Sequence, residues 1–125
     1  MHVFEYAVLR VVPRVEREEF MNVGVVVFCR ALGFLQCRCA PPGPRLRSLG
    51  GPALDLAELT ARLGAFGEIC RGRPAGGLIG SLPPAERFRW LTATRSTVLQ
   101  TSEVHPGLTA DAAATLARLF AELVE

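Results

Sequence analysis

Six polar residues could together carry out acid–base chemistry on an anionic substrate. They are spread along the chain, each at the end of or inside an apolar segment: Arg10, Glu19, Asn22, Arg95, Ser96 and His105. A carboxylate, an imidazole and a guanidinium are enough to move a proton and bind an anion if they converge. We expect such a site only if the side chains of Arg10, Glu19, Arg95 and His105 meet within about 8–10 Å, which allows one intervening water.

Each of these residues also has a simpler structural interpretation. Arg10 can form an ion pair at a strand edge, and Asn22 beside Gly24 indicates a β-bulge. Arg95–Ser96 and His105 suit turns at the two ends of a strand. The chain has no G-x-S-x-G sequence, phosphate loop or H-E-x-x-H sequence. The sequence therefore leaves enzymatic activity open and identifies no catalytic residue.

The four cysteines do not have the spacing of a zinc site. Cys37 and Cys39 form a C-x-C on a predicted strand, so their side chains share one face. A zinc ribbon needs C-x-x-C on a turn, where the chain can wrap around the metal. We interpret Cys29, Cys37, Cys39 and Cys70 as reduced, buried thiols, and we expect no metal and no cofactor.

A valine-rich strand over residues 20–29 organises the rest of the chain. Val23, Val25, Val26 and Val27 surround Gly24, and β-branched residues in such a run favour a strand buried on both faces. Both faces then need a cover, which either a helix or a second copy of the chain can supply. If a second copy supplies the cover, the protein forms a homodimer through the sheet, and we predict this homodimer.

The remaining hydrophobic pattern predicts an α+β fold. Predicted strands cover residues 3–13, 20–29, 34–40 and 96–104, and predicted helices cover 55–72 and 83–92 and follow a Thr109 cap. His105-Pro106-Gly107 is expected to end the last strand. The predicted order βββ-αα-β-α indicates a largely antiparallel four-stranded sheet with helices mainly on one face.

The length of 125 residues indicates a single domain over residues 1–125. The longest uncharged apolar run, residues 23–29, is far shorter than the roughly 20 residues of a membrane span. Residues 2–12 lack the pattern of a signal peptide, because Glu5 and Arg10 interrupt them. We therefore expect a soluble, cytoplasmic protein with no membrane partner.

All 14 basic residues are arginines, and the net charge is only +2. Guanidinium groups bind phosphates and carboxylates well, but a GC-rich genome also explains an excess of arginine. Nucleic-acid binding would use these arginines: Arg38, Arg45, Arg47, Arg71, Arg73, Arg87 and Arg89. Two observations argue against it: acidic residues are nearly as numerous as arginines, and no aromatic residues alternate with the arginines as stacking surfaces for bases.

Five segments together resemble a bacterial family of domains of unknown function, number 3037. They are E-Y-A-V-L-R-V-V-P (5–13), E-x-x-N-V-G-V-V-V-F (19–28), E-R-F-x-W-L (86–91), R-S-T-V-L-Q (95–100) and V-H-P-G-L (104–108). The resemblance covers nearly the whole chain and implies a bacterial protein. The family has no assigned activity, so it implies no catalytic residues. It does imply a kinase-like protein as a partner.

Three functions follow from these observations. A protein-interaction or regulatory module accounts for the apolar sheet and the lack of a catalytic motif. An enzyme or a binder of a small anionic ligand would use Arg10, Glu19, Arg95 and His105. Nucleic-acid binding through the arginines is the third. We expect the first, with a homodimer or a kinase-like protein as the partner.

Overall fold

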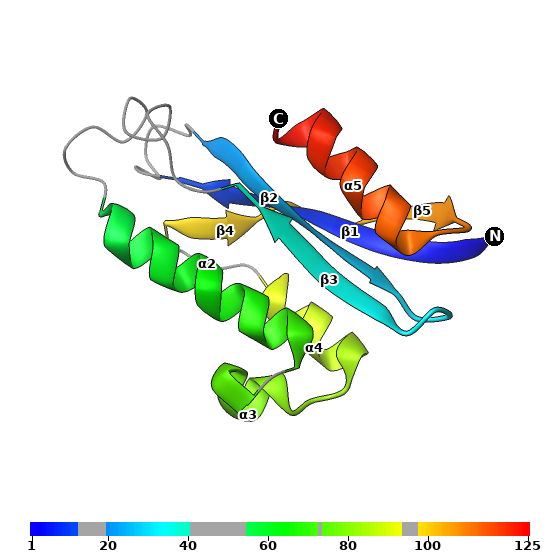
Figure 1. Ribbon diagram of the computed structural model, residues 1–125, viewed down its shortest axis with the longest axis horizontal. Coiled ribbons are helices and arrows are strands. Elements are labelled where there is room, and N and C mark those ends of the chain that lie inside the picture. Colours follow the sequence, from blue (N-terminus) through cyan, green and yellow to red (C-terminus); the bar gives the residue numbers. More distant parts are fainter. Residues whose placement is uncertain (13–19, 41–54, 73, 94–97) are drawn as a thin grey trace.

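The structure is a computed structural model, and it describes residues 1–12, 20–40, 55–72, 74–93 and 98–125. An antiparallel sheet forms its centre, with strand order β3-β2-β1-β4 and with β5 also paired to β1. Helices α2, α3 and α4 lie on one side of this sheet, and α5 lies on the other (Figure 1). The predicted α+β class with an antiparallel sheet is confirmed.

The elements follow the predicted ranges closely at the start of the chain. The strands are β1 (His2–Val11), β2 (Met21–Cys29), β3 (Phe34–Cys39), β4 (Leu99–Thr101) and β5 (His105–Thr109). The helices are α2 (Leu56–Arg71), the 3-10 helix η3 (Pro74–Gly76), α3 (Gly77–Gly80), α4 (Pro84–Leu91) and α5 (Ala112–Leu123). The short helix α3 was not predicted, because four residues are too few to show a helical period.

Strand β2 is buried on both faces, as its valines predict. Val25, Val26 and Val27 are fully inaccessible to solvent. The register against β1 shifts so that Leu9 lies opposite Gly24 and Arg10 opposite Asn22, which confirms a bulge beside Gly24. Burial of each valine side chain contributes about 1.5–3 kcal/mol, so β2 is a major source of the stability of the fold.

Two apolar layers cover β2. Helices α2 and α4 pack Leu59, Phe66 and Phe88 against the face that carries Val26 and Phe28. Helix α5 covers the other face, with these residues of both elements in contact: Val25, Val27, Cys29, Ala112, Leu116 and Leu119. Of the two covers that the sequence allows for the second face, the structure has the helix.

Strands β4 and β5 lie end to end along β1. Thr101 pairs with Leu9, and His105 pairs with Tyr6. Between them the backbone N–H of Val8 donates to Ser102 Oγ (2.8 Å). The prediction that His105-Pro106-Gly107 ends the strand is therefore wrong. Proline lacks an N–H but is tolerated on an edge strand, so this segment continues the sheet after a short interruption.

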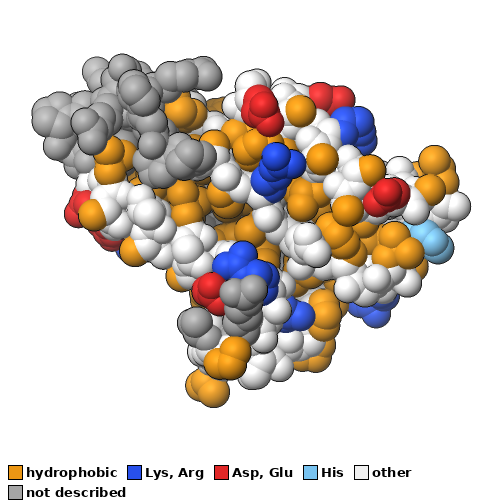
Figure 2. Space-filling view, in the orientation of Figure 1, with side chains coloured by type: hydrophobic (Ala, Val, Ile, Leu, Met, Phe, Trp, Pro, Cys, Tyr) orange, Lys and Arg blue, Asp and Glu red, His pale blue; other side chains and the backbone are white. Residues whose placement is uncertain are grey.

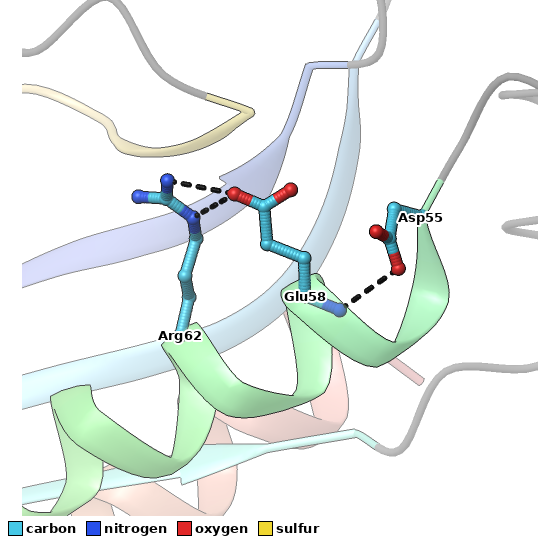
Figure 3. Close-up of polar contacts among 3 residues, drawn as sticks. All are labelled: Asp55, Glu58 and Arg62. Carbon is cyan, nitrogen blue, oxygen red and sulfur yellow. Dashed lines mark hydrogen bonds and ion pairs between the residues drawn. The ribbon is translucent and has the colours of Figure 1, made fainter.

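The helix ends follow the polar residues around them. Asp55 accepts a hydrogen bond from the backbone N–H of Glu58 (3.0 Å) and so begins α2, while Glu58 itself binds Arg62 (Figure 3). Gly72 ends α2 with φ +70°, as predicted. The predicted Thr109 cap of α5 is wrong, because Asp111 caps this helix and accepts from the N–H of Ala114 (3.1 Å).

The longest described helix, α2, has 16 residues. A membrane span needs roughly 20 apolar residues in a helix. Within the described ranges, no helix is long and apolar enough to cross a membrane.

A substitution at Gly107 should destabilise the fold. A Cβ added to Gly107 would lie 2.5 Å from a ring carbon of Phe4, which is buried. We expect Gly107→Ala to lower the free energy of unfolding by about 1–3 kcal/mol through overpacking, measured by urea denaturation.

Gly64→Ala is the matched control. Nothing lies within 4 Å of the added Cβ at Gly64, which is in the interior of α2. This variant should be more stable by up to about 1 kcal/mol, because alanine favours the helix. Equal effects of the two substitutions would contradict the packing of β5 on Phe4.

Candidate functional site

Of the six predicted polar residues, the structure describes Arg10, Asn22 and His105, and His105 lies apart from the other two. Glu19, Arg95 and Ser96 lie outside the described residues. Arg10 lies opposite Asn22, whereas His105 lies opposite Tyr6, which is four residues from Arg10 along β1. At about 3.3 Å per residue, their positions differ by about 13 Å, which exceeds the 8–10 Å limit set above. His105 therefore lies outside the site of Arg10 and Asn22.

Arg10 and Asn22 lie opposite each other on β1 and β2, and Asn22 ties the end of α5 to the sheet. The guanidinium of Arg10 stacks 4.4 Å from the centre of the Phe20 ring. Asn22 Nδ2 donates to the carbonyl oxygen of Leu123 (3.0 Å) in the last turn of α5. Within the described part of the chain, Arg10 Nε and Asn22 Oδ1 are buried without a hydrogen-bond partner. They are a donor and an acceptor on one face, so a bridging water would satisfy both.

His105 occupies an exposed position at the start of β5. Its ring centre lies 5.3 Å from that of Tyr6, with the two planes tilted by 41°. This cross-strand aromatic contact gives His105 a structural role in holding β5 on β1.

Three thiols form a cluster on the side of the sheet that α2 covers. Cys37 and Cys39 alternate with exposed residues of β3, so both face the same apolar layer. Cys70 lies in the last turn of α2 and is buried in that layer. Cys37 is the member of the cluster whose pKa both other thiols lower.

The cluster holds a negative charge on Cys37. Hydrogen bonds from Cys39 and then from Cys70 lower the pKa of Cys37 from 9.0 to about 4, and the nearby charge of Arg71 also lowers it. Burial acts in the opposite direction but is the smaller effect. The pKa values of Cys39 and Cys70 are raised, mainly because each hydrogen bonds to Cys37 and also because both are buried.

A cavity of about 510 Å³ opens beside Cys37 and Cys70. Its lining is predominantly polar and combines the end of the β2–β3 hairpin, β3, and parts of α2 and α4: Gly33, Leu35, Gln36, Cys37, Cys70, Arg71, Pro84 and Arg87. Arg71 is half-exposed and is bound to Glu68 (3.0 Å), a contact that raises its pKa. The cavity therefore offers a thiolate and two guanidinium groups to a small or anionic group.

Arg87 fixes the wall of this cavity. Its Nη1 donates to the carbonyl oxygens of Ile69 (3.0 Å) and Cys70 (2.8 Å), and its Nε donates to Leu82 (2.9 Å). The last carbonyl groups of a helix have no partner within the helix, and a cation there also suits the helix dipole. One side chain of α4 thus holds the end of α2, and Cys70 with it, in place.

A second, smaller cavity of about 190 Å³ lies between α2, α4 and β4. Its lining is mainly apolar and includes Phe66, Trp90 and Leu99. It contains no thiol, carboxylate or imidazole among the residues that line it, so it offers no chemistry of its own. We therefore take the thiol-lined cavity as the candidate functional site.

The sequence indicated only part of this site. The C-x-C spacing predicts that Cys37 and Cys39 share a face, and the structure agrees. That Cys70 meets them depends on how α2 crosses β3, which no local pattern shows. In the described residues, no three His, Cys, Asp or Glu side chains are placed to hold a metal ion. The arrangement is suited to nucleophilic chemistry of a thiolate.

The fold and the site define a small α+β protein in which a thiol cluster and two arginines face a cavity beside an edge strand. The family model of proteins of unknown function DUF3037 matches residues 6–124. The chain therefore belongs to the DUF3037 family, as its motifs indicate. No curated protein and no solved structure matches the chain significantly.

The low pKa of Cys37 predicts an unusual pH dependence of its alkylation. A thiol with an ordinary pKa near 8.5 loses roughly 100-fold in reactivity between pH 8 and pH 6, because only the thiolate reacts. Because of its lowered pKa, Cys37 remains a thiolate at both pH values, so its alkylation rate should fall less than threefold. The measurement is the rate of iodoacetamide labelling of the tryptic peptide 31–38 by mass spectrometry.

The charged and titratable groups that face Cys37 are Cys39 on its own strand, Cys70 and Arg71 on α2, and Arg87 on α4. Arg71→Gln removes one positive charge and should raise the pKa of Cys37, so labelling should begin to fall at a higher pH than in the unmodified protein. A 100-fold decrease in the unmodified protein would contradict the anionic cluster.

Replacement of Arg87 should weaken the end of α2. Lysine keeps the charge but cannot donate to three carbonyl groups from one planar head. We expect Arg87→Lys to lower the free energy of unfolding by about 1–3 kcal/mol, since hydrogen bonds from charged groups are lost. Arg89→Lys, at an exposed position of α4, is the matched control and should change stability by less than about 0.5 kcal/mol.

Proposed function

We propose that the protein is an interaction module that binds an extended segment of a partner protein along β3. The bound segment adds a strand to the sheet and places an acidic side chain in the cavity beside Arg71, whose guanidinium is half-exposed. The observation that supports this proposal most is the position of that cavity, next to an edge strand and lined by two guanidinium groups.

Strand β3 offers the backbone groups that strand addition requires. Among the described residues it is hydrogen bonded to β2 alone, so alternate N–H and C=O groups face away from the sheet. Its six residues include no proline. An added strand would form main-chain hydrogen bonds over this length, which is how several peptide-binding domains gain affinity.

The other open edge is less suitable. Strand β5 contains Pro106, which has no N–H to donate, and it has only five residues. Val3 and Leu108 are both 63% exposed and form a cross-strand pair there. A single apolar pair offers contact area but little specificity, whereas the β3 edge offers hydrogen bonds and charge.

Charge selects the partner segment. Figure 2 shows basic side chains over the face that contains β3 and the C-terminal end of α2. Arg71 and Arg87 lie on the α2 side of β3, and the guanidinium of Arg38 lies on the other side, 4.9 Å from the centre of the Phe120 ring. A strand beside β3 would thus have Arg71 on one side and Arg38 on the other, so acidic side chains that reach these two guanidinium groups fit best.

The same positions argue against the other two functions. Arg38 lies on the opposite side of the sheet from Arg71 and Arg87, and Arg87 is committed to carbonyl groups. Arg45, Arg47 and Arg73 lie outside the described residues. Arg10 and His105 lie too far apart along β1 to bind one ligand together. A kinase-like protein remains a candidate source of the bound segment, and a homodimer remains a prediction.

Selection from a display library of random ten-residue peptides tests this proposal. The reduced, full-length protein should enrich peptides with acidic residues at both odd and even positions, because alternate side chains of a strand point to opposite faces. Arg71→Glu should weaken binding of a synthesised, enriched peptide at least tenfold, because attraction becomes repulsion. N-methylation of the peptide backbone at alternate residues should abolish binding at one set of positions only, as strand addition requires.

Arg62→Glu is the matched control, since Arg62 lies on the same helix and pairs with Glu58 (2.9 Å) as Arg71 pairs with Glu68 (Figure 3). It should change binding less than twofold. Equal weakening by both variants would show a general charge effect and contradict the proposal. A stable dimer in light scattering that excludes the peptide would assign this edge to a second copy and would also contradict it.

A further inference from the structure

We propose that Cys37 is a site of reversible oxidation by hydroperoxides and that Cys70 completes the reaction by forming a disulfide with it. The proposal concerns the thiols alone and does not depend on a partner segment. It goes beyond the binding function, because it assigns a covalent modification to the cavity.

Cys37 has the two properties of an oxidation-sensitive thiol. It is partly exposed and lines an open cavity of about 510 Å³, which a hydroperoxide can enter. Cys39 and Cys70 belong to the same apolar layer, and they and the charge of Arg71 lower the pKa of Cys37, which favours its thiolate form. Cys29 provides a contrast within the same chain: it is fully buried beneath α5 and contacts the carbonyl oxygen of Val3 (3.5 Å).

Cys70 is the better partner of the two neighbouring thiols. It lines the same cavity as Cys37, and Cys39 does not. Cys37 and Cys39 are two residues apart on one strand, which separates their Cα atoms by about 6.6 Å. That distance is near the upper end of the roughly 4.4–6.8 Å range of disulfides, and parallel side chains on one strand approach each other poorly.

The reaction balances with a hydroperoxide as the oxidant. The Cys37 thiolate attacks the outer oxygen, the S–O bond forms, the O–O bond breaks, and the leaving alkoxide or hydroxide takes up a proton. Cys37 is thereby oxidised to a sulfenic acid. The Cys70 thiol then loses its proton and attacks that sulfur, so the S–S bond forms and hydroxide leaves as water. In total, two thiols and one hydroperoxide give a disulfide, an alcohol or water, and one further water.

Oxidation of Cys37 also prepares Cys70 for the second step. The pKa of Cys70 is raised mainly by its hydrogen bond to Cys37, and the negative charge of Cys37 adds to this. A neutral sulfenic acid removes that charge, while the positive charge of Arg71 continues to favour the Cys70 thiolate. Arg87 holds the carbonyl of Cys70 at 2.8 Å, so the second thiol stays beside the cavity.

Peptide mapping tests the proposal on the unmodified, full-length chain. Trypsin cleaves after arginine and places the four cysteines on four peptides: 18–30, 31–38, 39–45 and 63–71. The reduced protein is treated with hydrogen peroxide, remaining thiols are alkylated, and the digest is analysed by mass spectrometry. We expect peptide 31–38 to be linked to 63–71 at least tenfold more than any other pair.

Variants separate the two steps. Cys70→Ser should stop the disulfide and leave Cys37 as a sulfenic acid that dimedone traps. Cys37→Ser should reduce peroxide consumption at least tenfold. Cys29→Ser is the control and should retain the 37–70 link, because Cys29 lies on the α5 side of the sheet, away from the cluster.

Three results would overturn the proposal: a predominant 37–39 link, oxidation of Cys37 no faster than that of Cys29, or trapping of sulfenic acid on another cysteine. The mapping needs no variant, so a variant that fails to fold does not prevent a decision. The peptide selection above uses reduced protein, and failure of that binding leaves this result unaffected.

Discussion

The whole structure depends on the need to bury β2 on both faces. Val25 and Val27 face α5, and Val26 and Phe28 face α2 and α4. A sheet with one solvated face cannot accommodate such a strand, so the chain must supply helices on both sides. The C-terminal helix returns across the sheet for this reason, and Asn22 secures its last turn at the strand that it covers.

The thiol cluster is a consequence of two independent constraints. The period of two in β3 turns Cys37 and Cys39 toward the α2 layer. The end of α2 is placed separately, by the hydrogen bonds from Arg87 to the carbonyl groups of Ile69 and Cys70. Neither constraint alone brings three sulfur atoms together. Gly24 adds a third requirement, because a Cβ there would lie 2.9 Å from Cys39 Sγ and prevent the close approach of β3.

The sequence predicts those features of the fold that are set locally. The predicted ranges of the first three strands and the start of the helix at residue 55 agree with the structure because neighbouring residues determine them. Gly64 is also explained locally, because nothing lies within 4 Å of a Cβ added there and no distant residue requires a glycine at this position.

The elements that the sequence mispredicts are those whose structure depends on residues far away in the chain. Pro106 and Gly107 are typical of a turn, yet they form an edge strand because Phe4 packs against Gly107 and Ser102 bridges to Val8. Thr109 is typical of a cap, but its hydroxyl bonds Thr115 (2.6 Å) and leaves the cap to Asp111. The same limit applies to the site, because Cys70 is 31 residues beyond Cys39 and meets it only through tertiary packing.

Coverage of both faces also changes where the protein can meet another chain. The argument for a homodimer relied on a bare sheet face, and α5 removes that face. Unpaired backbone groups remain at the sheet edges, and β3 differs from β5 in carrying no proline. A strand beside β3 would direct alternate side chains toward Arg38 on Phe120 and toward the thiol-lined cavity. Because those two surfaces differ in chemistry, they would fix the register of a bound segment, which backbone hydrogen bonds alone cannot do.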